Sequence, residues 1–300
     1  MPTFATRPSA LARWQTDHII TLLQTVWPNL TCHTEIISTQ GDRVLDKPLP
    51  EIGGKGLFTS ELEDALRAGR VHAAVHSLKD LPTKDSPGLT IGAIPARADA
   101  RDAWVCPAGY TLKTLPQGAT VGTSSTRRRA QLLAHRPDLN IQPIRGNVDT
   151  RLRKVQEGQY DAIVLASAGL TRLGLQAHIT AYLTFDEMLP APGQGALAVQ
   201  CRADDADTLA ILHALEHAPT RRAVIAERAF LDALGGGCSL PVGAYATVDG
   251  ETLTLRGIIA SPDGTQRLTL IGQGTHPVQL GHALAAQALE QGAAQIVSPV

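Results

Sequence analysis

Hydrophobic and polar residues along the first two-thirds of the chain follow two alternating spacings. Apolar residues recur at helical spacing over 11–27 and 58–66, and helices also fit the segments 126–135 and 148–156. Short apolar or alternating runs between them predict strands at 32–38, 72–78, 89–94, 103–106, 120–122, 140–144 and 162–165. This alternation predicts βαβ units and an α/β fold with mostly parallel sheets.

The last third of the chain has a different pattern. A helix is predicted over 220–234, and alternating segments follow over 242–247, 252–260 and 267–272. The sequences VDGE and SPDG lie between these segments and are typical of hairpin turns. A final helix is predicted over 280–291, so this part should be a small α+β module with an antiparallel sheet.

The length of 300 residues suits two or three domains. Two segments without periodicity are candidate crossovers between domains, namely ARADARDA after Pro95 and PAPGQG over 190–195. A strand predicted over 196–201 would then return to the first sheet.

The composition excludes several classes of protein. Hydrophobic residues make up 43% and charged residues 18%, which excludes a disordered or fibrous chain. A net charge of -1 and an aromatic content of 4% do not favour nucleic acid or a membrane as a partner. We find no signal peptide pattern, no apolar run near the roughly 20 residues of a membrane span, and no CxxC pair. We therefore expect a cytoplasmic protein with neither disulfides nor a metal site.

The largest local imbalance of charge lies in 119–154, where basic residues outnumber Asp138 and Asp149. Some of them follow GTSS, at a predicted strand-to-helix turn. Such a turn supplies backbone N–H groups, hydroxyls and the positive end of a helix dipole, and arginines bind carboxylates or phosphates through paired donors. The candidate anion-binding residues here are Thr123, Ser124, Ser125, Arg127 and Arg128.

A second strand end, IRGNVDTR over 144–151, repeats this design. Its candidate residues are Arg145, Gly146, Asn147 and Arg151. Two anion sites at the carboxyl ends of neighbouring parallel strands suit a ligand with several anionic groups. A solvated basic helix face would explain the charges alone, but the flanking GTSS and RGN sequences favour the anion sites.

The sequence HSLKD over 76–80 lies where an apolar strand ends. Asp80 is a candidate for holding a positive charge that develops on a substrate, and Lys79 for binding an anion. On this pentapeptide alone, a turn aspartate beside a solvated lysine is the commoner explanation. His72 and His76 would lie far apart along a strand, which argues against a metal site between them.

Two glycine-rich sequences look like nucleotide-binding motifs but fail as such. GGKG over 53–56 lacks the first glycine and the Ser/Thr of a P-loop, and GQGALA over 193–198 leads into a strand. The surrounding segment 39–56, which carries Lys55, is explained equally well as a lid or as a plain surface loop.

Cys238 ends the sequence LGGGCS, whose glycines allow close approach of the backbone to a neighbour. A thiol on such a loop is a candidate nucleophile or attachment point for a covalent group. An inert, buried cysteine beside a helix end is the commoner outcome for a single cysteine.

Taken together and in this order, the motifs resemble the porphobilinogen deaminase family, also called hydroxymethylbilane synthases. The resemblance begins near Thr3, covers nearly the whole chain, and is carried by ATRPSALARWQ, GGKGLF, AVHSLKDLP, VGTSSTRRRAQL, IRGNVDTRL, YDAIVLASAGLTRLGL, LPAPGQGALAVQCR, AERAFL and GGGCSLPVGAYA. One departure is RPSALA, since the family usually has its proline after the serine. The arginine and the serine of this motif are kept.

The resemblance implies two lobes like those of type II periplasmic binding proteins, followed by a small α+β domain. Domain 1 would comprise 1–97 and 196–215, domain 2 would comprise 98–195, and domain 3 would comprise 216–300. The family is usually monomeric.

The resemblance also implies an activity in tetrapyrrole and heme biosynthesis. The family condenses four porphobilinogen molecules head to tail, releasing ammonia each time, to give hydroxymethylbilane. Its cofactor is a dipyrromethane joined through a thioether to the loop cysteine, which here is Cys238. Loss of ammonia leaves a cation shared by the pyrrole nitrogen, and the carboxylate that stabilises it would be Asp80.

By motif matching, further residues bind the acetate and propionate groups of the cofactor and the growing chain, and Phe58 covers a ring. The matched residues are Arg7, Ser9, Lys55, Ser77, Lys79, Thr123, Ser124, Ser125, Arg127, Arg128, Arg145, Arg151 and Arg172, with Gln194 near the hinge between the lobes.

Two other functions compete with this hypothesis. A solute-binding protein for a polyanion would explain the lobes and the arginines, but not Asp80 or Cys238. A nucleic-acid-binding protein would use the basic stretch, but the net charge of -1 counts against it.

Overall fold

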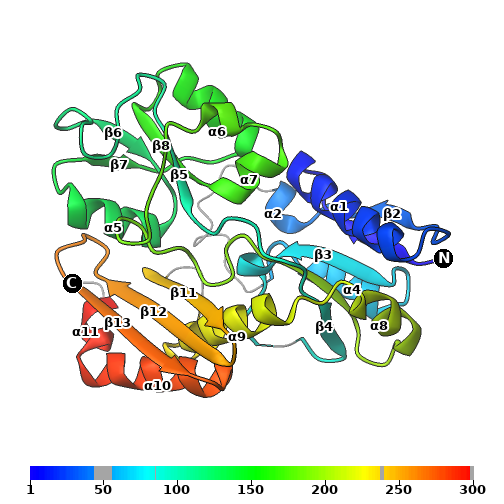
Figure 1. Ribbon diagram of the computed structural model, residues 1–300. Helices are drawn as coiled ribbons and strands as arrows, with labels where there is room; N and C mark the ends of the chain where they lie inside the picture. The colour runs from blue at the N-terminus through cyan, green and yellow to red at the C-terminus, as the bar shows by residue number, and fades with distance from the viewer. Residues whose placement is uncertain (44–55, 85, 237–239, 298–300) are drawn as a thin grey trace. The chain divides into compact units, whose positions relative to one another are not determined.

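The computed structural model describes residues 1–43, 56–84, 86–236 and 240–297. The chain divides into two compact units, Met1–Ala98 with Ala196–Arg221, and Asp99–Gly195 with Arg222–Val300. Figure 1 shows the elements of each unit. The finer division into three domains stays a prediction.

The first unit is built on a five-stranded sheet with the order β2-β1-β3-β10-β4. β2, β1 and β3 are parallel, whereas β10 is antiparallel to both β3 and β4, so β10 alone opposes the direction of the other strands. The predicted return of the chain to this sheet after PAPGQG is therefore confirmed. The strands are β1 (Thr3–Thr6), β2 (His33–Ile36), β3 (Ala73–Ser77), β4 (Leu89–Ala93) and β10 (Leu197–Arg202).

Helices of the first unit pack their apolar faces on this sheet. Ser9 begins α1 by accepting a hydrogen bond from the Ala12 N–H at 3.3 Å. The helix then buries Ile19 and Leu23 in one cluster with Phe4 of β1, and each such side chain contributes about 1.5–3 kcal/mol. The helices described here are α1 (Ala10–Val26), α2 (Gln40–Arg43), α4 (Ser60–Arg67), the 3-10 turn η1 (Leu78–Asp80) and α8 (Ala206–His213).

The second unit contains a sheet of the same design, with the order β7-β6-β8-β5-β9. β7, β6 and β8 are parallel, and β5 is antiparallel to β8 and β9. Its strands are β5 (Asp102–Val105), β6 (Thr120–Gly122), β7 (Asn140–Gln142), β8 (Ala162–Ala166) and β9 (Ala181–Tyr182). Its helices are α5 (Thr126–His135), α6 (Val148–Gln156), α7 (Ser167–Arg172) and the 3-10 turn η2 (Gln176–His178).

The same unit also holds an antiparallel sheet, β11-β12-β13, whose core includes Phe230, Leu255 and Leu284. Gly257 of β12 must be a glycine, because a Cβ there would lie 2.6 Å from the Phe230 ring. The elements are β11 (Val242–Asp249), β12 (Thr252–Ala260), β13 (Arg267–Gly274), α10 (Pro277–Glu290), α11 (Ala293–Val297) and most of α9 (Ala218–Ala233), whose first residues, up to Arg221, belong to the first unit.

The structure confirms the predicted fold class, with two mixed, mostly parallel sheets and a small antiparallel sheet. The bounds predicted for α5, α6, β6 and β12 agree with those observed. The sequence analysis missed α8, although Asp205 marks its start by accepting a hydrogen bond from the Thr208 N–H at 3.0 Å. None of the described helices is both long and apolar enough to cross a membrane.

Candidate functional site

The end of β3 places the HSLKD residues. The strand is buried up to His76, and the Gln15 amide donates a hydrogen bond to the Ser77 hydroxyl at 2.9 Å. Leu78 is fully buried, and its N–H donates to the Ala196 carbonyl at 3.0 Å, which fixes the turn η1. Lys79 is half-buried and Asp80 is exposed. A rigid, buried anchor therefore holds an accessible carboxylate at the carboxyl end of a strand.

His76 is buried just before this turn, with 5% of its surface exposed. Burial lowers the pKa of its imidazole to about 4, helped by the positive charge of Arg7, while the neighbouring Gln200 side chain opposes the shift. His76 is consequently neutral at pH 7, which agrees with its place inside the sheet and does not suit a cationic role.

Arg7 lies beside an acidic partner that the sequence analysis did not identify. Its Nε donates to Asp42 Oδ2 at 3.1 Å and its NH2 group to Asp42 Oδ1 at 2.5 Å. The Phe58 ring covers the guanidinium, with its centroid 4.2 Å from Cζ. Burial opposes ionisation of Asp42, but hydrogen bonds from Arg7 and Thr39 outweigh it and lower the pKa of this carboxyl. In this structure the Asp42 carboxylate therefore binds the Arg7 guanidinium at the place where a carboxylate of a ligand would bind.

In the second unit, the GTSS turn links two strand ends. The Ser125 hydroxyl caps α5 by accepting from the Arg128 N–H at 3.4 Å, and the Thr123 hydroxyl accepts from the Ser125 N–H at 3.2 Å. The Ser124 hydroxyl accepts from the Ile144 N–H at 3.0 Å and donates to the Ile144 carbonyl at 2.8 Å. Ser124 thereby joins the two turns that the sequence predicted as neighbouring anion sites.

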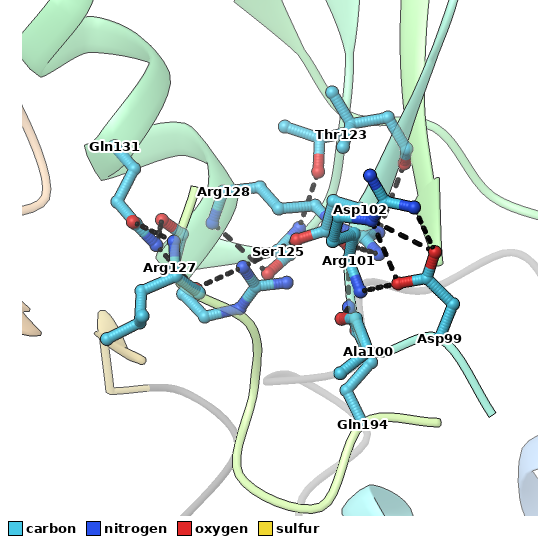
Figure 2. Close-up of polar contacts among 12 residues, drawn as sticks. Asp99, Ala100, Arg101, Asp102, Thr123, Ser125, Arg127, Arg128, Gln131 and Gln194 are labelled. Atoms are coloured by element: carbon cyan, nitrogen blue, oxygen red, sulfur yellow. Dashed lines mark hydrogen bonds and ion pairs between the residues drawn. The ribbon is translucent and has the colours of Figure 1, made fainter. Parts of the chain in front are cut away.

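Two arginines of this turn converge on a single buried carboxylate, Asp102, as Figure 2 shows. Arg127 donates through NH1 to Asp102 Oδ2 at 2.8 Å. Arg128 donates to Asp102 Oδ1 through Nε at 3.1 Å and through NH2 at 2.7 Å. Exposed fractions are 4% for Arg127, 7% for Arg128 and 0% for Asp102, so the whole cluster is removed from water.

Backbone carbonyls and an amide complete the Asp102 cluster. Arg127 also donates to the Leu189 carbonyl at 2.8 Å, and Arg128 to the Val164 carbonyl at 3.1 Å. The Gln194 amide donates to Asp102 Oδ1 at 3.0 Å and to the Ala100 carbonyl at 2.8 Å (Figure 2). Gln194 thus connects two segments of the chain. The chain enters the β7-β6-β8-β5-β9 sheet at 100–102 and leaves this part of the fold at 194.

The charges of this cluster explain its pKa shifts. Burial alone would raise the pKa of Asp102, but the two guanidiniums outweigh it and hold that pKa far below its usual range. Burial lowers the pKa of Arg127 more than Asp102 raises it. Two guanidiniums share one carboxylate, so the cluster has a formal charge of about +1 directly behind the GTSS turn.

The second predicted anion turn is held by its own basic residues. Gly146 has a φ of +111°, and a Cβ there would lie 2.7 Å from the Thr150 side chain. Arg151 Nε donates to the Gly146 carbonyl at 2.7 Å, and Lys154 Nζ donates to the Arg145 carbonyl at 3.3 Å. Asn147 is exposed at the start of α6. The turn therefore presents exposed and half-buried polar groups around a glycine with a positive φ.

Arg172 is a further cation of this unit and is half-buried. Its NH2 group donates to the Gly195 carbonyl at 2.7 Å, and burial lowers the pKa of its guanidinium to about 10. A desolvated arginine gains most from an anion nearby, because the surrounding low dielectric strengthens their attraction.

The structure divides the predicted site residues between the two units. The first unit contains Arg7, Ser9, Phe58, Ser77, Lys79 and Asp80. The second contains Thr123, Ser124, Ser125, Arg127, Arg128, Arg145, Gly146, Asn147, Arg151, Arg172 and Gln194. Lys55 and Cys238 lie outside the described residues.

The sequence analysis missed Asp42 and Asp102 as partners of the predicted arginines. It balanced the charges of 119–154 against Asp138 and Asp149, whereas Arg127 and Arg128 pair with Asp102 from outside that segment. One signal was present, because Asp102 directly precedes an apolar strand, where an ionised side chain needs a partner.

Family models and known sequences match nearly the whole chain. The model described as "Porphobilinogen deaminase, dipyromethane cofactor binding domain" matches residues 3–210, and "Porphobilinogen deaminase, C-terminal domain" matches 221–290. A porphobilinogen deaminase of Brevibacillus brevis is 49% identical, over 98% of this chain and 96% of its own. One of a Roseiflexus species is 53% identical, over 96% of this chain and 95% of its own.

Solved structures are more distant. A nutrient-binding protein of Burkholderia cenocepacia bound to methionine has a TM-score of 0.44 and 14% identity, over 72% of this chain and 90% of its own.

We predict that Asp102→Asn destabilises the second unit by roughly 3–5 kcal/mol, because it leaves two buried guanidiniums without their counter-charge. Urea denaturation followed by circular dichroism measures the change. The control is Asp138→Asn, which removes the partner of Arg136 in a half-buried pair; because solvent still reaches and screens this pair, the unfolding midpoint should shift less. Equal shifts for the two variants would contradict the role of the buried cluster.

A second prediction concerns pH. The unfolded chain protonates His76 near pH 6.5, whereas the folded chain does so only near pH 4. Stability from neutral His76 is therefore full above pH 6.5 and is lost as the pH falls toward 4. Between pH 7 and pH 5 this loss is about 2 kcal/mol in the free energy of unfolding.

The test compares urea denaturation at pH 7 and pH 5 for the wild type and for His76→Gln. The variant should lose this part of the pH dependence, and His282→Gln, at an exposed position of α10, should keep it. An unchanged pH dependence in His76→Gln would show that another group causes it.

Proposed function

The chain belongs to the porphobilinogen deaminase family, and on that basis we propose how its own residues carry out the reaction. The enzyme condenses porphobilinogen head to tail, releases ammonia and forms hydroxymethylbilane, in tetrapyrrole biosynthesis. It is a transferase with a dipyrromethane cofactor. The observation that carries the residue assignments is the exposed Asp80 carboxylate at the end of β3, held by the buried Leu78.

We assign Asp80 to the pyrrole N–H of the reacting substrate. When the aminomethyl C–N bond of porphobilinogen breaks and ammonia leaves, the remaining methylene carbon shares its positive charge with the pyrrole nitrogen. A carboxylate that accepts a hydrogen bond from this N–H stabilises the cation. A C–C bond then forms between this methylene carbon and the free α-carbon of the last pyrrole in the growing chain. That α-carbon then loses its proton. Asp80 is the group we propose to accept this proton.

Carboxylate side chains of the substrate need fixed cations and hydroxyls. Arg7 and Ser9, with Ser77 and Lys79, would supply them from the first unit. The GTSS and RGN turns and Arg172 would supply them from the second, where the Asp102 cluster adds a positive charge of about +1. In our proposal Arg7 binds a substrate carboxylate in exchange for Asp42, and Phe58 covers a ring.

The donor set also fits a dipyrromethane, because its acetates and propionates need the same arginines and hydroxyls. When bound, this cofactor supplies the pyrrole carbon from which the product chain starts. We propose Cys238 as the residue that holds it through a thioether, and Lys55 as a further carboxylate ligand. Both residues lie outside the described part of the chain, so their assignment depends on the motifs GGGCS and GGKG.

Three further assignments complete the proposal. The chain forms three domains, 1–97 with 196–215, 98–195, and 216–300. It acts as a monomer in the cytoplasm on porphobilinogen, with neither nucleic acid nor a membrane as a partner. The net charge of -1 supports the exclusion of nucleic acid.

We predict that Asp80→Asn lowers the turnover of porphobilinogen at least about 100-fold, because the amide cannot hold the cation or accept the proton. Consumption of porphobilinogen and release of ammonia measure the rate, and circular dichroism checks the fold. Asp17→Asn, at an exposed position of α1, is the matched control and should keep the wild-type rate. A near-normal rate for Asp80→Asn would refute its role.

A further inference from the structure

A cavity of about 200 Å³ lies in the second unit between α5 and the antiparallel sheet. One wall is the last part of α5, including Ala134 and His135, and the other is the face of β12 and β13. The segment 185–189 closes it, and its Leu189 carbonyl is held by Arg127 and Gln131. None of the site residues assigned above lines this cavity.

The cavity has a cationic side. Arg256 and Arg267 both line it, with Asp186 as the acidic residue beside them. Arg256 donates through NH2 to Asp186 Oδ1 at 2.5 Å, while its Nε is buried and has no hydrogen-bond partner among the described residues. A buried guanidinium N–H without an acceptor is costly, and an incoming carboxylate oxygen would relieve that cost.

Apolar side chains also line the cavity. Phe185 stacks on Tyr245, with ring centroids 4.1 Å apart, so its ring is held in place. Leu189, Ile258 and Ala260 extend this surface. These side chains would bury a flat hydrocarbon group favourably.

We propose that this cavity binds a small organic monocarboxylate with a flat apolar body. Its carboxylate would accept hydrogen bonds from Arg256 and Arg267, and its body would lie on Phe185 and Leu189. The size fits, because a cavity of about 150 Å³ already accommodates benzene. The cavity begins about 9 Å along α5 from the GTSS turn, since Gln131 is its lining residue nearest to that turn. An occupant would therefore fix α5 against the antiparallel sheet.

Benzoate is the probe, and benzamide is its neutral match. Isothermal titration of the full-length, cofactor-loaded protein should show saturable binding of benzoate and at least about tenfold weaker binding of benzamide. Arg256→Gln should weaken benzoate binding about tenfold, the effect of one charge-assisted hydrogen bond. Arg153→Gln, on the exposed surface of α6, should bind as the wild type does. If Arg256→Gln fails to fold, Arg267→Gln takes its place.

Three results would overturn the proposal: no saturable benzoate binding, equal affinity for benzamide, or equal affinity in Arg256→Gln and Arg153→Gln. Loss of benzoate binding in Arg7→Gln together with unchanged binding in Arg256→Gln would also overturn it, because it would place the probe among the substrate-binding arginines. Turnover of porphobilinogen by Arg256→Gln should stay at the wild-type level. The proposal thus fails or stands independently of the catalytic assignments.

Discussion

The interaction of Asp102 with Arg127 and Arg128 is the constraint on which the second unit depends. An ionised carboxylate without solvent exposure is tolerated only with charged partners, and here both guanidiniums, with 4% and 7% exposure, are supplied by the first turn of α5. Through these two arginines Asp102 fixes the start of α5. Gln194, in the crossover segment 190–195, also donates a hydrogen bond to Asp102 and so ties this segment to the same carboxylate. Because the GTSS turn directly precedes the same helix, the pairing also fixes where that turn presents its hydroxyls and N–H groups.

Buried and exposed charges have different tasks in this chain. Asp102 is fully buried and its partners are fixed, which suits a structural role. Asp80 is exposed, and the rigidity of its position comes from the neighbouring Leu78, whose burial anchors the turn. Arg7 is intermediate between the buried Asp102 and the exposed Asp80. It is partly exposed and pairs with Asp42, a carboxylate of the same chain. In our proposal a substrate carboxylate replaces Asp42 on Arg7, while Asp42 keeps its hydrogen bonds from the N–H and the hydroxyl of Thr39.

Elements with strong periodicity and clear end signals were predictable from the sequence. The helix after GTSS and the hairpin at VDGE follow from capping and turn residues that act locally. The short helix α7 was missed because no capping side chain marks its start. The partner of Arg127 was missed for a different reason: Asp102 is 25 residues away in sequence, and only the sheet brings the two together. Local sequence thus identified the arginines and hydroxyls as candidate anion ligands but could not identify their counter-ions.

The central claim is that this chain is a porphobilinogen deaminase whose dipyrromethane cofactor is attached at Cys238. The most direct test is the intact mass of the purified protein under denaturing conditions, before and after incubation with porphobilinogen, followed by peptide mapping. The account predicts an excess mass equal to two condensed pyrrole units on the peptide that contains Cys238, present at purification or gained on incubation. An active protein with the mass of the bare chain, or an adduct on a different peptide, would contradict it.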